Sequence, residues 1–145
     1  MSDQTRGMRN NNPGNLRYAK TVAWAGLVKE SDRKDTAFFE FKSVYWGLRA
    51  MIMQIRNYYR KKNDSTIKEI ISRYAPSFEN NTKSYYEEVA KFCNLNSSYT
   101  ITPFTCLTGP NFEEILPFMI LRMCQIESKY TPDIRLLEFI CNLTV

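Results

Sequence analysis

The chain has 145 residues, of which 43% are hydrophobic and 14% aromatic, with five glycines and six prolines. This length and composition predict a single globular domain over residues 1–145 that buries its own core, and they exclude disordered, fibrous and repeat proteins. The 20 Lys and Arg against 15 Asp and Glu give a formal charge of +5, which suits nucleic acid, an acidic membrane surface or the bacterial cell wall without selecting one.

The chain contains no histidine. Ser-His, Cys-His and zinc-histidine sites are therefore excluded, and any acid–base chemistry must use carboxylates, tyrosine or lysine. The sequence also has no metal-ligand cluster and no phosphate-binding glycine motif, so we expect neither a metal nor a cofactor. The four cysteines are widely spaced, which predicts buried free thiols in a chain folded in a reducing compartment. They are Cys93, Cys106, Cys124 and Cys141.

The sequence carries no predicted signal for export or membrane insertion. Residues 1–7 contain no apolar stretch of signal-peptide length, and no segment approaches the roughly 18 apolar residues of a membrane span. We therefore expect a protein made in the cytoplasm without a signal peptide, which needs another route if it works elsewhere.

The first part of the chain, to about residue 40, is predicted to form turns and strands. Asn12-Pro13-Gly14-Asn15 predicts a type II turn, because proline fixes φ at the second position and glycine takes the positive φ that the third position requires. Residues 22–28 and 36–41 are β-branched or aromatic runs separated by a charged stretch. They predict a small β-hairpin.

Apolar residues at helical spacing predict helices through the rest of the chain. These cover about residues 43–60, a shorter stretch after Ser65, 82–92, a segment around 115–126, and 133–143. Ser43 and Ser65 are predicted N-caps, and the second helix should end before Pro76. The segment around 115–126 is apolar on nearly all sides, as a central helix is, and its Pro117 is tolerable in a first turn. The predicted fold is mainly α (α+β), a helical bundle around a buried central helix with a small β-hairpin lobe.

Glu127 directly follows this apolar segment. A carboxyl held beside apolar packing has a raised pKa and can act as a general acid, although a glutamate at a helix end is more often a solvated surface group. The stretch Glu127-Ser128-Lys129-Tyr130-Thr131-Pro132 resembles the Glu-Ser-x-aromatic-x-Pro signature of lytic transglycosylases in the lysozyme-like superfamily. In those families the glutamate is the catalytic acid/base at the end of a buried central helix.

A second resemblance lies at the other end of the chain. The sequence is similar to lysozyme-like virion proteins of phages and mobile elements. The matching positions are Arg6 to Arg17, Trp24-Ala25-Gly26, Phe38 to Phe41, Gly47 to Ala50, Ala75-Pro76, Glu79-Asn80, Thr82 and Tyr85. In ordinary transglycosylases the glutamate comes first, whereas here Glu127 comes last. We therefore expect a circularly permuted lysozyme-like domain in which the two chain ends are adjacent in space.

The resemblance implies a peptidoglycan-cleaving glycosidase, a muramidase or lytic transglycosylase of phage or mobile-element origin. It gives Glu127 the acid/base role, with Glu79 and Tyr85 supporting it. The positions expected to contact the glycan are Asn11, Asn12, Asn15, Arg17, Trp24, Ser128 and Tyr130.

Each supporting assignment has a structural alternative. Asn11 and Asn12 are about as likely to hydrogen-bond the backbone of their own turn. Trp24 and Tyr85 could be packing residues, and Glu79 could cap the helix that begins near residue 82.

Two rival functions follow from the same sequence. One is a catalytically inactive lysozyme-like module that binds glycan or forms part of a phage-like particle. Departures from the motif support it, because Lys129 stands where small residues are common and no Gly-rich stretch follows Asp133. The other is a nucleic-acid-binding domain, suggested by Tyr58-Tyr59-Arg60-Lys61-Lys62, but these cations fit better as a solvated helix end. The expected partners are peptidoglycan strands and other phage-particle proteins, and the expected place of action is the bacterial wall or periplasm, in association with the virion.

Overall fold

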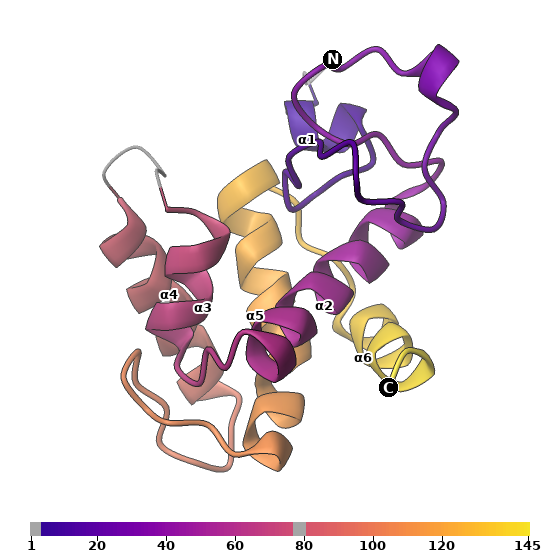
Figure 1. Cartoon of the computed structure of the whole chain (residues 1–145). Coiled ribbons are helices and arrows are strands. Elements are labelled where there is room, and N and C mark those ends of the chain that lie inside the picture. The colour runs from indigo at the N-terminus through magenta and orange to yellow at the C-terminus, as the bar shows by residue number, and fades with distance from the viewer. Residues whose placement is uncertain (1–3, 77–80) are drawn as a thin grey trace.

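The computed structural model describes residues 4–76 and 81–145. Within these ranges the chain is mainly helical, as predicted (Figure 1). The helices are α1 (Arg6–Arg9), α2 (Val44–Lys61), α3 (Ile67–Tyr74), α4 (Thr82–Leu95), α5 (Gly109–Ser128) and α6 (Ile134–Leu143), with a short 3-10 helix at Glu30–Asp32. The predicted helices after residue 43 are all present and begin or end within a few residues of the expected positions, except that α5 starts well before its apolar segment.

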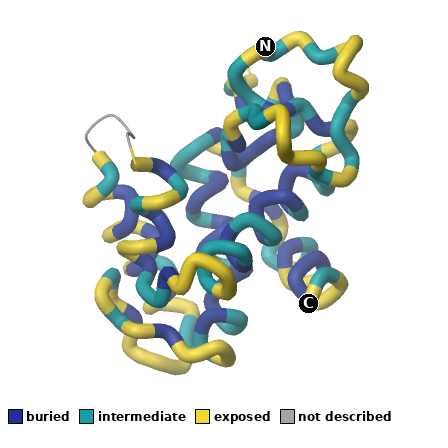
Figure 2. The backbone as a smooth tube through the Cα atoms, viewed as in Figure 1, coloured by how far each residue is buried: buried dark blue, intermediate teal, exposed yellow. Residues whose placement is uncertain are grey.

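Helix α5 is the centre of the molecule. It packs against α4, α6, α2 and α1, and Figure 1 shows it between the α3–α4 pair and the α2–α6 side. Its side chains Ile115, Leu116, Met119 and Ile120 are completely buried, and the buried backbone in Figure 2 concentrates around it. A helix that is apolar on most of its surface needs neighbours all round, and this arrangement supplies them.

The start of α5 differs from the prediction. Thr108 caps the helix by accepting a hydrogen bond from the Asn111 N–H at 3.2 Å, and Pro110 occupies the first turn. Pro117 therefore lies inside the helix and is buried. Its missing N–H removes one hydrogen bond from the helix interior, a cost that packing on all sides must offset.

The caps of α2 and α3 are partly as predicted. Ser43 is the N-cap residue of α2, but its side chain makes no capping hydrogen bond. Helix α3 is capped by Thr66 instead of Ser65, because Thr66 and Glu69 form a reciprocal capping box that fixes the start one residue later. The helix ends at Tyr74, before Pro76, as the proline predicts.

The predicted β-hairpin is absent from the described residues. In its place, backbone pairing in the N-terminal lobe (residues 4–42) is limited to isolated antiparallel bridges, Arg17 with Phe38 and Leu27 with Phe41. One carboxylate competes directly with this pairing. Asp35 accepts the N–H groups of residues 37 and 38, which lie in the second predicted strand and are thus already used. Glu40 accepts those of residues 34 and 35, in the stretch between the two predicted strands.

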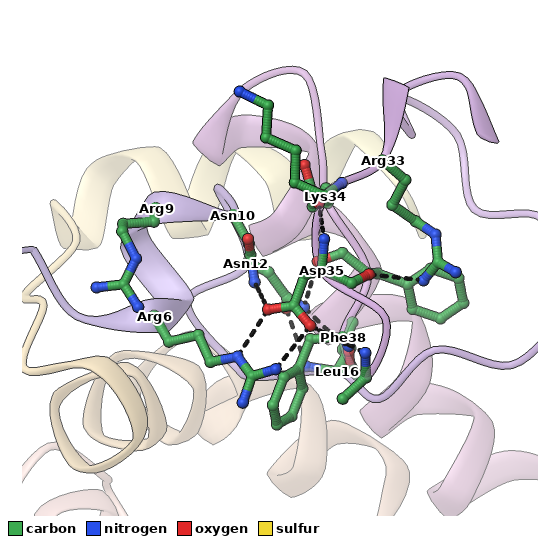
Figure 3. Close-up of polar contacts among 12 residues, drawn as sticks. Arg6, Arg9, Asn10, Asn12, Leu16, Arg33, Lys34, Asp35 and Phe38 are labelled. Atoms are coloured by element: carbon green, nitrogen blue, oxygen red, sulfur yellow. Dashed lines mark hydrogen bonds and ion pairs between the residues drawn. The ribbon is translucent and has the colours of Figure 1, made fainter. Parts of the chain in front are cut away.

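Asp35 is the main polar junction of this lobe (Figure 3). Its carboxylate accepts hydrogen bonds from Arg6 Nε at 2.7 Å and from Asn10 Nδ2 at 2.9 Å, in addition to the two backbone N–H groups. The Arg6 guanidinium holds the pKa of Asp35 well below its usual range, helped by the amide and backbone donors. A single side chain therefore ties α1, including its Arg6, to the loop around residue 35.

The Asn-rich turn is present but is not type II. The Asn15 N–H donates to the Asn12 carbonyl at 3.0 Å, yet the positive φ angles belong to Asn11 and Asn15, not to Gly14. Glycine is required at position 14 for a different reason. A Cβ there would collide with the Tyr74 hydroxyl and lie 2.6 Å from Met51 Sδ, so the turn rests directly on α2 and α3.

Helix α1, near the start of the described residues, is not adjacent to the end of α6, contrary to the expectation from the permuted motif order. Helix α1 packs against α5, whereas the end of α6, marked C in Figure 1, lies well away from α1. The end of α5 nevertheless meets the N-terminal lobe, since Thr5 Oγ1 donates to the Ser128 carbonyl at 2.9 Å. The motifs from the two halves of the sequence are brought together by this contact and not by neighbouring termini.

All four cysteines are free, as predicted. Cys93, Cys124 and Cys141 are buried in the helical core, whereas Cys106 is exposed. Burial raises the pKa of the Cys93 thiol to about 12 and that of Cys141 to about 11. These buried thiols pack as small apolar side chains.

Candidate active site

Glu127 lies in the last turn of α5, where the central helix meets the N-terminal lobe. The helix ends one residue later, and Lys129 takes the left-handed conformation with φ 53°. The Glu127 side chain is only partly exposed. Burial raises its pKa above the ordinary value, against the opposing effects of its hydrogen bonds with Asn15 and Tyr85 and of the positive charge of Arg17. A carboxyl in this state can hold a proton closer to neutral pH than a solvated glutamate.

The Glu127 carboxyl is held by one donor on each oxygen. Tyr85 Oη, from α4, donates to Oε2 at 3.0 Å. Asn15 Nδ2, from the Asn-rich turn, donates to Oε1 at 3.1 Å and to the Glu127 backbone carbonyl at 3.0 Å. Three separate parts of the chain therefore fix the orientation of one carboxyl group.

The carboxyl opens onto a cleft of about 970 Å³ between the N-terminal lobe, α2 and α3. Its walls include Asn15, Arg17, Trp24, Asn57, Arg73 and Glu127. A cavity of this size, with a few polar groups converging on an apolar lining, is typical of a ligand site.

The cleft brings together part of the predicted site. Asn15, Arg17, Trp24 and Glu127 all line it. Trp24 is half-buried and packs against the hydrophobic core. It therefore contributes to the cleft wall and to the packing of the N-terminal lobe at the same time. Tyr85 is buried and reaches the cleft only through its hydroxyl contact with Glu127.

Asn11 and Asn12 do not line the cleft. Asn12 is completely buried, and its amide donates to the carbonyls of Leu16 and Phe39 at 3.0 and 2.9 Å. Asn11 Nδ2 donates to the Phe41 carbonyl at 3.0 Å. Both side chains hold the N-terminal lobe together. The bond from Asn12 to Leu16 is local, as the structural alternative expected, whereas the bonds to Phe39 and Phe41 reach a distant segment of the lobe.

Ser128 and Tyr130 also lie outside the cleft lining. Ser128 is buried, and its hydroxyl donates to the Pro13 carbonyl at 2.8 Å. A Cβ on Gly7 would collide with this hydroxyl, so Ser128 joins α5 closely to the N-terminal lobe. Tyr130 is half-buried against the core. Glu79, the predicted second carboxylate, lies outside the described residues.

The cleft wall formed by α2 and α3 was not predicted from the sequence. Gln54, Asn57 and Tyr58 form a polar stripe on α2, and Tyr74 projects from α3. The Tyr74 hydroxyl donates to the Gly14 carbonyl at 2.6 Å, and burial raises its pKa well above the ordinary value. The available signal was the i, i+3, i+4 spacing of polar residues along one edge of the buried face of α2.

Comparison with known proteins identifies a phage relative of this chain. No protein-family model matches the chain. The chain is 31% identical over 134 residues to protein P5 of Pseudoalteromonas phage PM2, an alignment that covers 91% of this chain and 76% of that protein. The chain belongs to the P5 family. A phage relative agrees with the phage or mobile-element origin that the sequence predicted.

Two further observations on this P5-family protein concern metal binding and membrane insertion. No cluster of three or more potential metal-binding side chains occurs in residues 4–76 and 81–145. Over the same residues, every helix is too short or too polar to cross a bilayer.

Proposed function

We propose that this P5-family protein is a peptidoglycan-cleaving glycosidase of a phage or related element, with Glu127 as the acid/base. The observation that carries the proposal is the Glu127 carboxyl, which faces the cleft with a raised pKa and a hydrogen-bond donor on each oxygen. The resemblance of residues 127–132 to the transglycosylase signature supports it.

The chemistry requires a protonated carboxyl beside the bridging oxygen between two sugars. Glu127 donates its proton to that oxygen as the bond to the sugar carbon breaks, and positive charge develops on the ring. Among the described cleft-lining residues Glu127 is the sole carboxylate. A hydroxyl or N-acetyl group of the substrate is our candidate for stabilising the developing charge, as in substrate-assisted glycosidases.

The remaining cleft residues fit a glycan. The Trp24 indole offers a face for sugar stacking, and the amides of Gln54 and Asn57 offer donors and acceptors for hydroxyl and N-acetyl groups. In a phage, such an enzyme would act on the bacterial wall during particle entry or at lysis, as a component of the virion or beside other particle proteins.

The test is the substitution Glu127→Gln, which keeps the shape of the side chain and removes its proton. We expect peptidoglycan digestion to fall at least about 100-fold, the usual contribution of a general acid, with an unchanged circular dichroism spectrum. Glu87→Gln, at an exposed position on α4, is the matched control and should retain full activity.

Mass spectrometry of the released fragments would then distinguish hydrolysed sugars from anhydro sugars. Full activity of Glu127→Gln would refute the mechanism. Glycan binding by the wild-type protein without any fragment release would favour the inactive glycan-binding module.

A further inference from the structure

Arg17 is the cation of the cleft that lacks an acidic partner within the described part of the chain. Its backbone pairs with Phe38, and its guanidinium lies over the Phe38 ring, 5.1 Å from the ring centre. Arg73, the other cation on the cleft wall, is paired with Asp64 at 2.6 Å. Arg17 is therefore an exposed positive charge that forms no ion pair with any residue in 4–76 or 81–145.

The cleft as a whole is suited to an anionic ligand. Burial raises the pKa of its one described carboxylate, Glu127, and its unpaired cation is a guanidinium, which is a permanent charge in proteins. A polymer of neutral N-acetyl sugars offers such a cation hydrogen-bond acceptors but no negative charge. Peptidoglycan differs, because alternate sugars carry a short peptide with free carboxylates.

We infer that Arg17 binds a carboxylate of the stem peptide, so that the cleft selects peptide-bearing glycan over bare glycan. The inference rests on the proposed function and extends it by naming the part of the substrate that the cleft recognises. A guanidinium presents two parallel N–H donors that match a carboxylate. Contact with the Phe38 ring restricts the side chain beforehand, which reduces the entropy lost when it binds.

The position of Arg17 also links recognition to catalysis. Its positive charge lowers the pKa of Glu127, in opposition to burial. A bound peptide carboxylate would offset that charge, so Glu127 would keep its proton while a peptide-bearing strand occupies the cleft. The same strand without its peptide would leave Arg17 unpaired and Glu127 more easily ionised.

The test measures binding to peptidoglycan in variants that carry Glu127→Gln, so that cleavage does not contribute to the result. Full-length Glu127→Gln and the double variant Glu127→Gln/Arg17→Gln are incubated with purified peptidoglycan sacculi and with peptide-free strands of N-acetylglucosamine, namely chitin oligomers, which carry no carboxylate. We expect the Arg17 substitution to weaken binding to intact sacculi about three- to tenfold, the size of one exposed charged hydrogen bond. Binding to peptide-free strands should be unchanged and weaker from the outset.

Two controls, each made in the Glu127→Gln background, separate the specific contact from net charge. Arg135→Gln removes the same charge from an exposed position on α6, away from the cleft, and should leave binding unaltered. Arg17→Lys keeps the charge and should recover part of the binding. Circular dichroism and the melting temperature of each variant establish that it is folded.

Equal loss on both substrates, no loss on either, or no binding to sacculi at all would overturn the inference. Failure of the proposed function gives a different result, namely peptide-dependent binding through Arg17 with no cleavage by the wild-type protein. Cleavage that is indifferent to the peptide and to Arg17 would keep the proposed function and reject this inference.

Discussion

At the residue scale, the ionisation of Glu127 depends on a few identified neighbours. Burial raises its pKa, while Asn15, Tyr85 and Arg17 each lower it. The first two do so by donating hydrogen bonds to the charged form, and Arg17 does so through its positive charge. Each neighbour can therefore be tested by its effect on the pH at which activity is lost.

Tyr85→Phe removes the hydroxyl that donates to Glu127 Oε2. Because this bond favours the ionised carboxylate, its loss should raise the pKa of Glu127 further. A general acid works only while protonated, so the alkaline limb of the activity profile should move to higher pH. The measurement is the initial digestion rate against pH. Tyr86→Phe, the neighbouring buried tyrosine on α4, is the control, and a shift to lower pH would contradict the assignment.

Not every residue that carries the site could be found from the sequence. Glu127, Asn15, Arg17 and Trp24 occur in motifs and were predicted to share a site, and the cleft brings them together. Tyr74 belongs to no such motif. Its role depends on the approach of Gly14 to α3, a contact between distant segments that neither periodicity nor spacing specifies.

At the element scale, the helices could be predicted because apolar periodicity and the effect of Pro76 depend only on residues nearby in the sequence. The prediction of the β-hairpin was wrong because a side chain competes with backbone pairing. Residues 22–28 and 36–41 have strand-like composition, but Asp35 takes the N–H groups of residues 37 and 38, which the second strand of a hairpin would use. Helix α1 was missed because it is four residues long and owes its stability to the Thr5 cap and to packing on α5.

The N-terminal lobe should depend on Asp35 in place of a sheet. The pKa of Asp35 is lower in the folded state than in the unfolded chain, where it is near 4. The contribution of Asp35 to stability is therefore complete above the unfolded pKa and is lost as pH falls toward the folded pKa. Asp35→Asn should therefore reduce the free energy of unfolding by about 2 kcal/mol at pH 7 and by less at pH 3. Urea unfolding at both pH values measures this. Asp32→Asn, at an exposed position in the same lobe, should have little effect at either.

Gly14→Ala tests the contact between the Asn-rich turn and the helices. The added methyl group would collide with Tyr74 and Met51, which should cost about 1–3 kcal/mol and displace Asn15 from Glu127. We expect both a lower melting temperature and a loss of activity. Gly109→Ala is a matched control because nothing lies within 4 Å of its Cβ position. Equal melting temperatures for the two variants would show that the turn does not need glycine for space.

At the scale of the whole molecule, the arginines that the structure describes differ in whether an acidic group pairs with their charge. Most arginines that the structure describes in contact with acidic groups serve to join elements, as when Arg56 connects α2 to Glu113 on α5 at 2.8 Å. Arg17 is different because its charge remains available in the cleft. The formal charge of +5 alone suits several partners, and the position of Arg17 in the cleft is the basis for our proposal of a peptide carboxylate as its ligand.

The hydrogen bond between Asn15 and Glu127 joins residues 112 positions apart in the chain. A ribosome synthesises the Asn-rich turn early and the end of α5 late, so a growing chain holds the turn for most of its synthesis without the carboxyl that the turn orients. Any incomplete chain that stops before α5 lacks the acid altogether. The proposed site is therefore complete only when α5 has been synthesised and has packed against the N-terminal lobe.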